Sequence, residues 1–181
     1  WYAQNNDIAT AVGHALSAGD LERAASLVEE NVLIFKDHAE LPTVVRWLDA
    51  FPEEMVHARP WLCVAKSWAF AYVGQFTDIE RFLQEAEGTL ETAAAGEEQR
   101  HIRGHIAAIR SYVALFHGDL TRSIEQGTIA LEKLPESDLQ TRQSAATTLA
   151  SALRLDGDLA TAGHVLMDAI AMSRTLGSDQ T

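Results

Sequence analysis

The chain has 181 residues, 47% of them apolar, which is enough for one domain with a core or for a short array of repeats. No uninterrupted apolar run of about 18 residues is present, so no membrane-spanning helix is predicted. The 14 Lys and Arg against 26 Asp and Glu leave a formal net charge of −12, and binding to nucleic acid, which requires clustered cations, is not expected. The first residues contain neither Met nor a signal-peptide core, so the chain is interpreted as a piece of a longer cytoplasmic protein.

A short sequence motif recurs along the chain. It reads AGDLERAA at residues 18–25 and VGQFTDIE at residues 73–80. Glycine can adopt positive φ and close one helix, the following aspartate can cap the next helix, and the leucine then begins a new apolar face. Each copy therefore predicts a turn between two antiparallel helices. The predicted hairpin turns lie near Gly19, Gly74, Gly118 and Gly157.

Residues 31–59 form a longer connection between the first two copies. Their pattern predicts the tail of a helix, a turn near residues 37–41 and one inserted helix from about Pro42 to Ala50. Pro52 is expected to stop that helix and Pro60 to begin the next one.

Residues 97–117 have apolar side chains spaced by three and four, as one face of an α-helix requires. The members of this stripe are Ile102, Ile106, Ile109, Val113 and Phe116. Similar stripes follow Gly118 and Gly157, and Pro135 is expected to end the helix between them. Period-two alternation is nearly absent, so the predicted fold class is all-α.

A small residue recurs twelve positions after three of the turn glycines, namely Ala86, Ala130 and Ala169, whereas the first copy has Asn31 there. Small side chains let the two helices of a hairpin approach closely. Gly104 and Gly127 lie inside predicted helices, where close packing would have to offset their low helix propensity. The turn glycines are 55, 44 and 39 residues apart, and periods near 40 are typical of helical solenoids.

These features resemble tetratricopeptide-like (TPR-like) repeats. The predicted architecture is one domain over residues 1–181, an α-solenoid of about four antiparallel helix hairpins plus one inserted helix, forming a right-handed superhelix.

Residues 44–87 and the opening 30 residues resemble the helical sensor region of the MalT-like, large ATP-binding regulators of the LuxR group. The matching residues are Trp47-Leu48, Phe51-Pro52-Glu53-Glu54, Arg59-Pro60-Trp61-Leu62, Ala65, Trp68-Ala69, Gly74, Leu83 and Ala86-Glu87. The resemblance implies a transcription regulator in which these repeats bind an inducer or inhibitory partners and control self-association. The chain contains no G-x-x-x-x-G-K-[ST] phosphate loop and no basic helix-turn-helix, so ATP hydrolysis and DNA binding are not assigned to it.

No catalytic constellation is found, and neither a cofactor nor a metal is predicted. His101 and His105 share a helix face, but a zinc site needs three or four ligands and no H-E-x-x-H motif or cysteine pair completes one. The single Cys63 lies in an apolar stretch and is expected to be a buried structural thiol. Serine residues such as Ser111 lie inside predicted helices, where an activated nucleophile is not expected.

The candidate binding residues come from aligning the repeats on their turn glycines. The first helix of each hairpin normally lines the concave face of a solenoid. The residues placed there are Trp61, Trp68, His105, Tyr112, Ser151 and Arg154. Aromatic faces beside hydrogen-bonding groups suit a sugar or another small polar effector, and they equally suit a peptide or partner helix. Packing between repeats is the alternative role of the same aromatic residues.

The predicted function is a non-catalytic effector-sensing and protein-interaction module of a bacterial-type transcription regulator. A small effector or a protein partner would bind the concave face and modulate self-association. The alternative is a TPR-like interaction scaffold with no small-molecule ligand.

Overall fold

The computed structural model describes residues 2–30, 41–91 and 96–178, and within these ranges the chain forms ten helices and no strand. This confirms the all-α prediction. The contacts divide the chain into two compact units, Trp1–Ala94 and Ala95–Thr181, and each unit is described by itself. The prediction of one continuous domain and of a right-handed superhelix stays a prediction.

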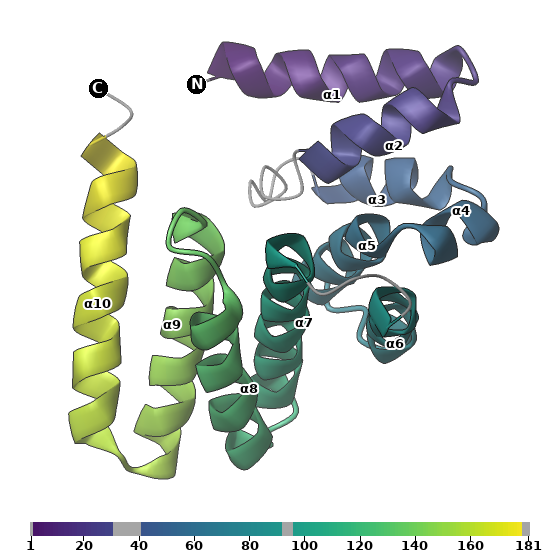
Figure 1. Ribbon diagram of the computed structural model, residues 1–181. Coiled ribbons are helices and arrows are strands. Elements are labelled where there is room, and N and C mark those ends of the chain that lie inside the picture. The colour runs from purple at the N-terminus through teal and green to yellow at the C-terminus, as the bar shows by residue number, and fades with distance from the viewer. Residues whose placement is uncertain (1, 31–40, 92–95, 179–181) are drawn as a thin grey trace. The chain divides into compact units, whose positions relative to one another are not determined.

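The first unit contains two helix hairpins and two helices between them in sequence (Figure 1). Helices α3 and α4 fill the connection: α3 contacts α1 and α5, whereas α4 contacts α5 and α6. Helix α5 is packed against four neighbours, because α2 and α6 also contact it. The bounds are α1 Tyr2–Ser17, α2 Leu21–Glu30, α3 Leu41–Asp49, α4 Glu53–Ala58, α5 Pro60–Tyr72 and α6 Ile79–Glu91.

The short helix α4 was not predicted, since the sequence indicated only one inserted helix. Pro52 ends α3 as expected, but its carbonyl also accepts hydrogen bonds from the amides of Met55 and Val56 and so begins a new turn. Glu53 and Glu54 occupy the first turn, where negative charge is favourable. A proline that stops one helix therefore also caps the next one, which begins at the following residue.

The second unit consists of helices that stand side by side in Figure 1, coloured teal to yellow. Helix α9 contacts both α7 and α8, and α10 packs on α9. This is the contact pattern of stacked hairpins, in which the first helix of one hairpin touches both helices of the preceding one. The bounds are α7 Glu97–Phe116, α8 Leu120–Lys133, α9 Leu139–Asp156 and α10 Leu159–Ser178.

The four predicted hairpin turns have nearly the same backbone structure. The glycines have φ of 75°, 76°, 76° and 100° in chain order. The residue after each glycine donates its amide hydrogen to the carbonyl five residues earlier, which defines the Schellman motif. These donor–acceptor pairs are Asp20 to Ala15, Gln75 to Phe70, Asp119 to Ala114 and Asp158 to Leu153. In the three Gly-Asp turns the aspartate side chain then caps the next helix, at 3.0 to 3.1 Å.

Small residues mark the close contacts inside the hairpins, as predicted. Ala86, Ala130 and Ala169 are all buried, while Asn31 and residues 37–40 of the predicted turn lie outside the described residues. A Cβ added at Gly104 would lie 2.9 Å from the Leu134 side chain, so the glycine permits a close approach there.

The crossing of α7 and α8 is equally tight. At Gly127 an added Cβ would lie 3.0 Å from the Ser111 hydroxyl. Ser111 and Ser123 donate hydrogen bonds to each other's carbonyl oxygens across this crossing. The helices of the described ranges include none that is long and apolar enough to cross a membrane.

Candidate functional site

The hairpin of α9 and α10 carries two of the predicted binding residues. Helix α9 begins at the cap Asp138, whose Oδ1 accepts the Thr141 amide at 3.0 Å, and it ends at the left-handed Gly157. Asp158 then caps α10 by accepting the Thr161 amide at 3.0 Å. Small and branched apolar side chains hold the pair together: Leu149, Leu153 and Ala162 form a buried cluster with Ile124, Leu131 and Val165 against it.

A groove of about 250 Å³ lies between α9 and α10. One wall comes from α9 and includes Thr147, Ser151 and the exposed Arg154, so it presents hydroxyl groups and a cation. The opposite wall comes from α10 and is apolar, with Leu159 and Leu166. Ala150, Ala162 and Gly163 complete the lining.

The two walls differ in the contacts they can make. The Ser151 hydroxyl donates to the Thr147 carbonyl at 2.8 Å, which leaves its oxygen able to accept a further hydrogen bond. The Arg154 guanidinium can bind an anionic group in a bidentate manner. The arrangement can therefore hold a ligand that has a short apolar body and an anionic or hydroxyl group.

The other predicted residues are not in this groove. Trp61 is half-buried on α5, and Trp68 is only 5% exposed and stacks on Tyr72 with ring centroids 5.4 Å apart. Tyr112 is half-buried on α7 beside the exposed Phe116, so the apolar stripe of that helix does not stay buried to its end. Burial raises the pKa of the Tyr112 hydroxyl. The predicted concave face that would contain all six residues stays a prediction, since Trp61 and Trp68 belong to the first unit and the other four residues to the second.

His105 is completely buried and belongs to a polar cluster with His101 and Asp138. The Asp138 Oδ2 atom lies 2.9 Å from His101 Nε2 and 3.0 Å from His105 Nε2. The two Nε2 atoms are 3.2 Å apart. The three atoms thus form a nearly equilateral triangle between α7 and the start of α9.

The Asp138 carboxylate is held in its charged form. Burial alone raises the pKa of this carboxyl, but hydrogen bonds from His101, His105 and the Thr141 amide, with the charge of His105, outweigh burial and hold the pKa well below its usual range. These contacts explain how a charged carboxylate whose side chain is only 3% exposed persists in the interior.

Sequence reasoning found the histidine pair and missed Asp138. His105 and Tyr112 are seven residues apart on one face of α7, and His105 contacts Asp138 in the turn before α9. The sequence feature that indicates Asp138 is its position directly before the apolar Leu139, where a helix cap is expected. Its contact with residues 33 and 37 positions earlier depends on the packing of two hairpins, which no local pattern shows.

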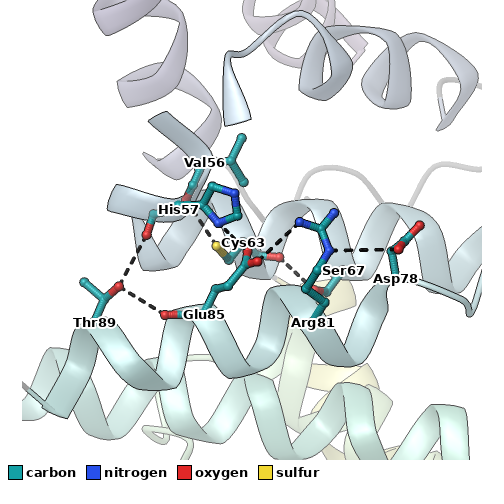
Figure 2. A network of polar contacts seen from close by, with 8 residues as sticks. All are labelled: Val56, His57, Cys63, Ser67, Asp78, Arg81, Glu85 and Thr89. Atoms are coloured by element: carbon teal, nitrogen blue, oxygen red, sulfur yellow. Dashed lines mark hydrogen bonds and ion pairs between the residues drawn. The ribbon is translucent and has the colours of Figure 1, made fainter. Parts of the chain in front are cut away.

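A second polar network joins α4, α5 and α6 in the first unit (Figure 2). Glu85 lies 2.8 Å from His57 Nδ1 and 3.3 Å from Arg81 Nη1. Thr89 donates to the carbonyls of Glu85 and His57, and the Cys63 thiol donates to the Val56 carbonyl at 3.1 Å.

This network is unsuited to thiol chemistry. Burial, followed by the charge of Glu85, raises the pKa of the Cys63 thiol from 9.0 to about 12. A nucleophilic cysteine needs the opposite shift, because the thiolate is the reactive form. The side chain is fully buried, as the sequence predicted for a structural thiol.

The similarity to known proteins extends over nearly the whole chain. A protein of Cronobacter sakazakii named HTH-type transcriptional regulator MalT is 27% identical over 174 residues, which cover 96% of this chain. Proteins of the same name from Klebsiella pneumoniae and Yersinia pestis are 25% and 24% identical over 174 and 166 residues, or 96% and 92% of the chain. No protein-family model matches the chain, and no solved structure matches it.

The chain spans 18–19% of the length of these curated relatives. It resembles the MalT-type transcriptional regulators and aligns with one region of these longer proteins.

Proposed function

We propose that the chain is the effector-sensing and protein-interaction part of a cytoplasmic transcription regulator and that it has no catalytic activity of its own. The observation that carries this proposal is the groove between α9 and α10, lined by the predicted residues Ser151 and Arg154. It occurs in a chain that resembles transcriptional regulators over 96% of its length. DNA binding and ATP binding are left to other parts of the regulator.

The groove favours an effector with one polar end. Arg154 and Ser151 supply a cation and a hydroxyl group on the α9 side, whereas Leu159 and Leu166 on α10 supply apolar contact. A volume of about 250 Å³ suits a small metabolite rather than a long oligomer. The expected ligand class is a small carboxylic or phosphorylated metabolite with a short apolar body.

Helix α10 also provides a surface for self-association. Its large apolar side chains Leu159, Leu166, Met167 and Ile170 are exposed. Such a patch on one helix marks a protein-interaction surface. Two of these residues, Leu159 and Leu166, also line the groove.

The shared residues provide the proposed mechanism. A ligand held between α9 and α10 would favour one tilt of α10 against α9. The same tilt sets how the apolar residues of α10 are presented to a second copy, so ligand binding and self-association are linked. The effect can be no larger than the difference in ligand affinity between the two arrangements.

The test is thermal unfolding of the chain with a panel of metabolites at millimolar concentration. A ligand at a hundred times its Kd stabilises the fold by about 2.7 kcal/mol. Gly163→Leu should abolish the response, because Gly163 lines the groove and nothing lies within 4 Å of an added Cβ. Arg154→Gln should weaken it.

The matched control is Gly88→Leu, since Gly88 is exposed inside α6 and also has nothing within 4 Å of an added Cβ. The control should respond to the ligand like the wild type. A response that survives in Gly163→Leu would contradict the proposed groove. No response to any metabolite would favour the second candidate, an interaction scaffold without a small ligand, which the exposed apolar residues of α10 support.

A further inference from the structure

The triangle of His101, His105 and Asp138 has the dimensions of a metal-binding face. Zinc binds histidine nitrogen and carboxylate oxygen at about 2.0–2.2 Å, so neighbouring donor atoms of a tetrahedral site lie roughly 3.3 Å apart. The three separations here are 2.9, 3.0 and 3.2 Å. An ion at the same bonding distance from all three atoms would lie about 1 Å outside their plane. One tetrahedral position would then stay open for a fourth ligand.

Hydrogen bonds alone do not account for all three contacts. A neutral imidazole carries one N–H, so two histidines supply at most two protons for the three contacts of the triangle. If both Nε2 atoms are protonated and donate to Asp138 Oδ2, two donors face each other at 3.2 Å. A divalent cation would instead be coordinated by one lone pair from each of the three atoms.

The ligands are also held in place before any ion binds. The other carboxylate oxygen of Asp138 accepts the Thr141 amide at 3.0 Å as the cap of α9, which turns Oδ2 toward the histidines. His101 and His105 are one turn apart on α7, a helix long enough to fix their spacing. Preorganisation of this kind favours binding, because little side-chain freedom remains to be lost.

Access to the cluster is from one side. The side chains of His105 and Asp138 are 1% and 3% exposed, whereas that of His101 is 28% exposed. A hollow of about 350 Å³ adjoins His101 and is lined also by Glu97, Lys133 and Ser137. It offers an entry path and room for a water molecule as the fourth ligand.

We propose that His101, His105 and Asp138 bind one zinc ion in tetrahedral geometry, with solvent as the fourth ligand. Two imidazoles and one carboxylate suit zinc better than magnesium or calcium, which prefer oxygen ligands. The bound ion links α7 to the first turn of α9 and thereby joins the two hairpins of the second unit. The site is independent of the groove between α9 and α10.

The experiment uses the full chain without an affinity tag, stripped of metal by a chelator and then titrated with Zn²⁺ against a chromophoric competitor. One equivalent should bind, and Co²⁺ should give the intense visible absorption of a four-coordinate site. Saturating Zn²⁺ should raise Tm by at least about 5 °C. Mg²⁺ should have no such effect.

Two variants separate metal binding from folding. His101→Ala removes the most exposed ligand, and Asp138→Asn removes the charged ligand while it keeps a good helix cap. Both should lower Zn²⁺ affinity by more than about 100-fold, since loss of even an outer-shell partner costs 10- to 100-fold. The control is His164→Ala, which removes an exposed histidine of α10 and should bind Zn²⁺ like the wild type.

Equal Zn²⁺ binding by the wild type, His101→Ala and Asp138→Asn would overturn the proposal. So would a wild-type chain that binds no Zn²⁺ or shows no four-coordinate Co²⁺ spectrum. The cluster would then be a hydrogen-bonded support for the cap of α9. Circular dichroism of each metal-free variant verifies that the helices are formed.

Discussion

Cys63 and Asp138 are both buried, yet their neighbours shift the two pKa values in opposite directions. Around Cys63, burial and the charge of Glu85 disfavour the thiolate. Around Asp138, two histidines and a backbone amide favour the carboxylate strongly enough to outweigh burial. Burial therefore does not decide the charge of a group by itself, and the contacts of each group must be considered.

The shifted pKa of Cys63 predicts a slow reaction with alkylating reagents. The pKa of about 12 instead of 9.0 lowers the thiolate fraction of the folded chain about 1000-fold near pH 8. Iodoacetamide labelling followed by mass spectrometry should therefore be slow without denaturant and fast in urea. Rapid labelling of the folded chain, at the rate seen in urea, would show that the thiol is not buried as described.

The same shift fixes the sign of a pH dependence. The folded thiol retains its proton up to a higher pH than the unfolded thiol. The contribution of Cys63 to the free energy of unfolding is thus complete below pH 9 and falls as the pH rises toward about 12. Urea unfolding of the wild type and Cys63→Ala at several alkaline pH values measures this difference. The same dependence of the free energy of unfolding on pH in both proteins would contradict it.

Single residues were predictable where a local rule governs them. The buried Ala86, Ala130 and Ala169 follow from their fixed distance to the turn glycines. Trp68 was assigned to the concave face with packing between repeats as the alternative, and it is 5% exposed on α5, a helix that contacts four neighbours. The contact of His105 with Asp138 could not be predicted, because Asp138 comes from another hairpin.

At the scale of helices, Gly104 in α7 and Gly127 in α8 lie where a neighbouring residue leaves no room for a side chain. Gly104 faces Leu134, the residue that ends α8, and Gly127 faces both Ser111 and Leu149. Their low helix propensity is offset by packing that a larger residue would prevent. Nothing lies within 4 Å of a Cβ added at Gly88, so no close packing offsets the low helix propensity of this glycine.

Alanine substitution should therefore have opposite effects at two helix-interior glycines. Gly104→Ala should destabilise the fold by about 1–3 kcal/mol, because its Cβ would meet Leu134 at 2.9 Å. Gly88→Ala should stabilise it by about 0.5–1 kcal/mol, because alanine is the better helix former. Urea unfolding of the two variants measures both values, and stabilisation by Gly104→Ala would refute the close approach.

Most of the helices were predictable because glycine, aspartate and proline mark their ends. The four turns and the starts of α3 and α5 lie where the sequence placed them. Helix α4 was not predicted, because Pro52 was taken only as a stop, whereas its carbonyl begins a further turn. A proline has this double role whenever the residues after it can continue as a helix.

At the scale of the whole molecule, repetition of one turn accounts for the helix hairpins within each unit, whereas α3 and α4 of the first unit lie between two hairpins. The second unit shows it most clearly, since α9 packs on both helices of the preceding hairpin. The predicted groove of six residues assumed one continuous array and stays a prediction, and two of its members, Ser151 and Arg154, line the groove between α9 and α10. Which residues meet depends on contacts between hairpins, and the spacing of glycines does not contain that information.

The proposed self-association surface lies on α10 of the α9–α10 hairpin, and sedimentation velocity over a range of concentrations tests it most directly. The wild type should associate increasingly with concentration, and Met167→Glu should lower the association constant at least about tenfold, because it puts a charge on the exposed apolar residues of α10. Val73→Glu, at an exposed apolar residue of the first unit, should associate like the wild type. Equal behaviour of the wild type and Met167→Glu would contradict the assignment.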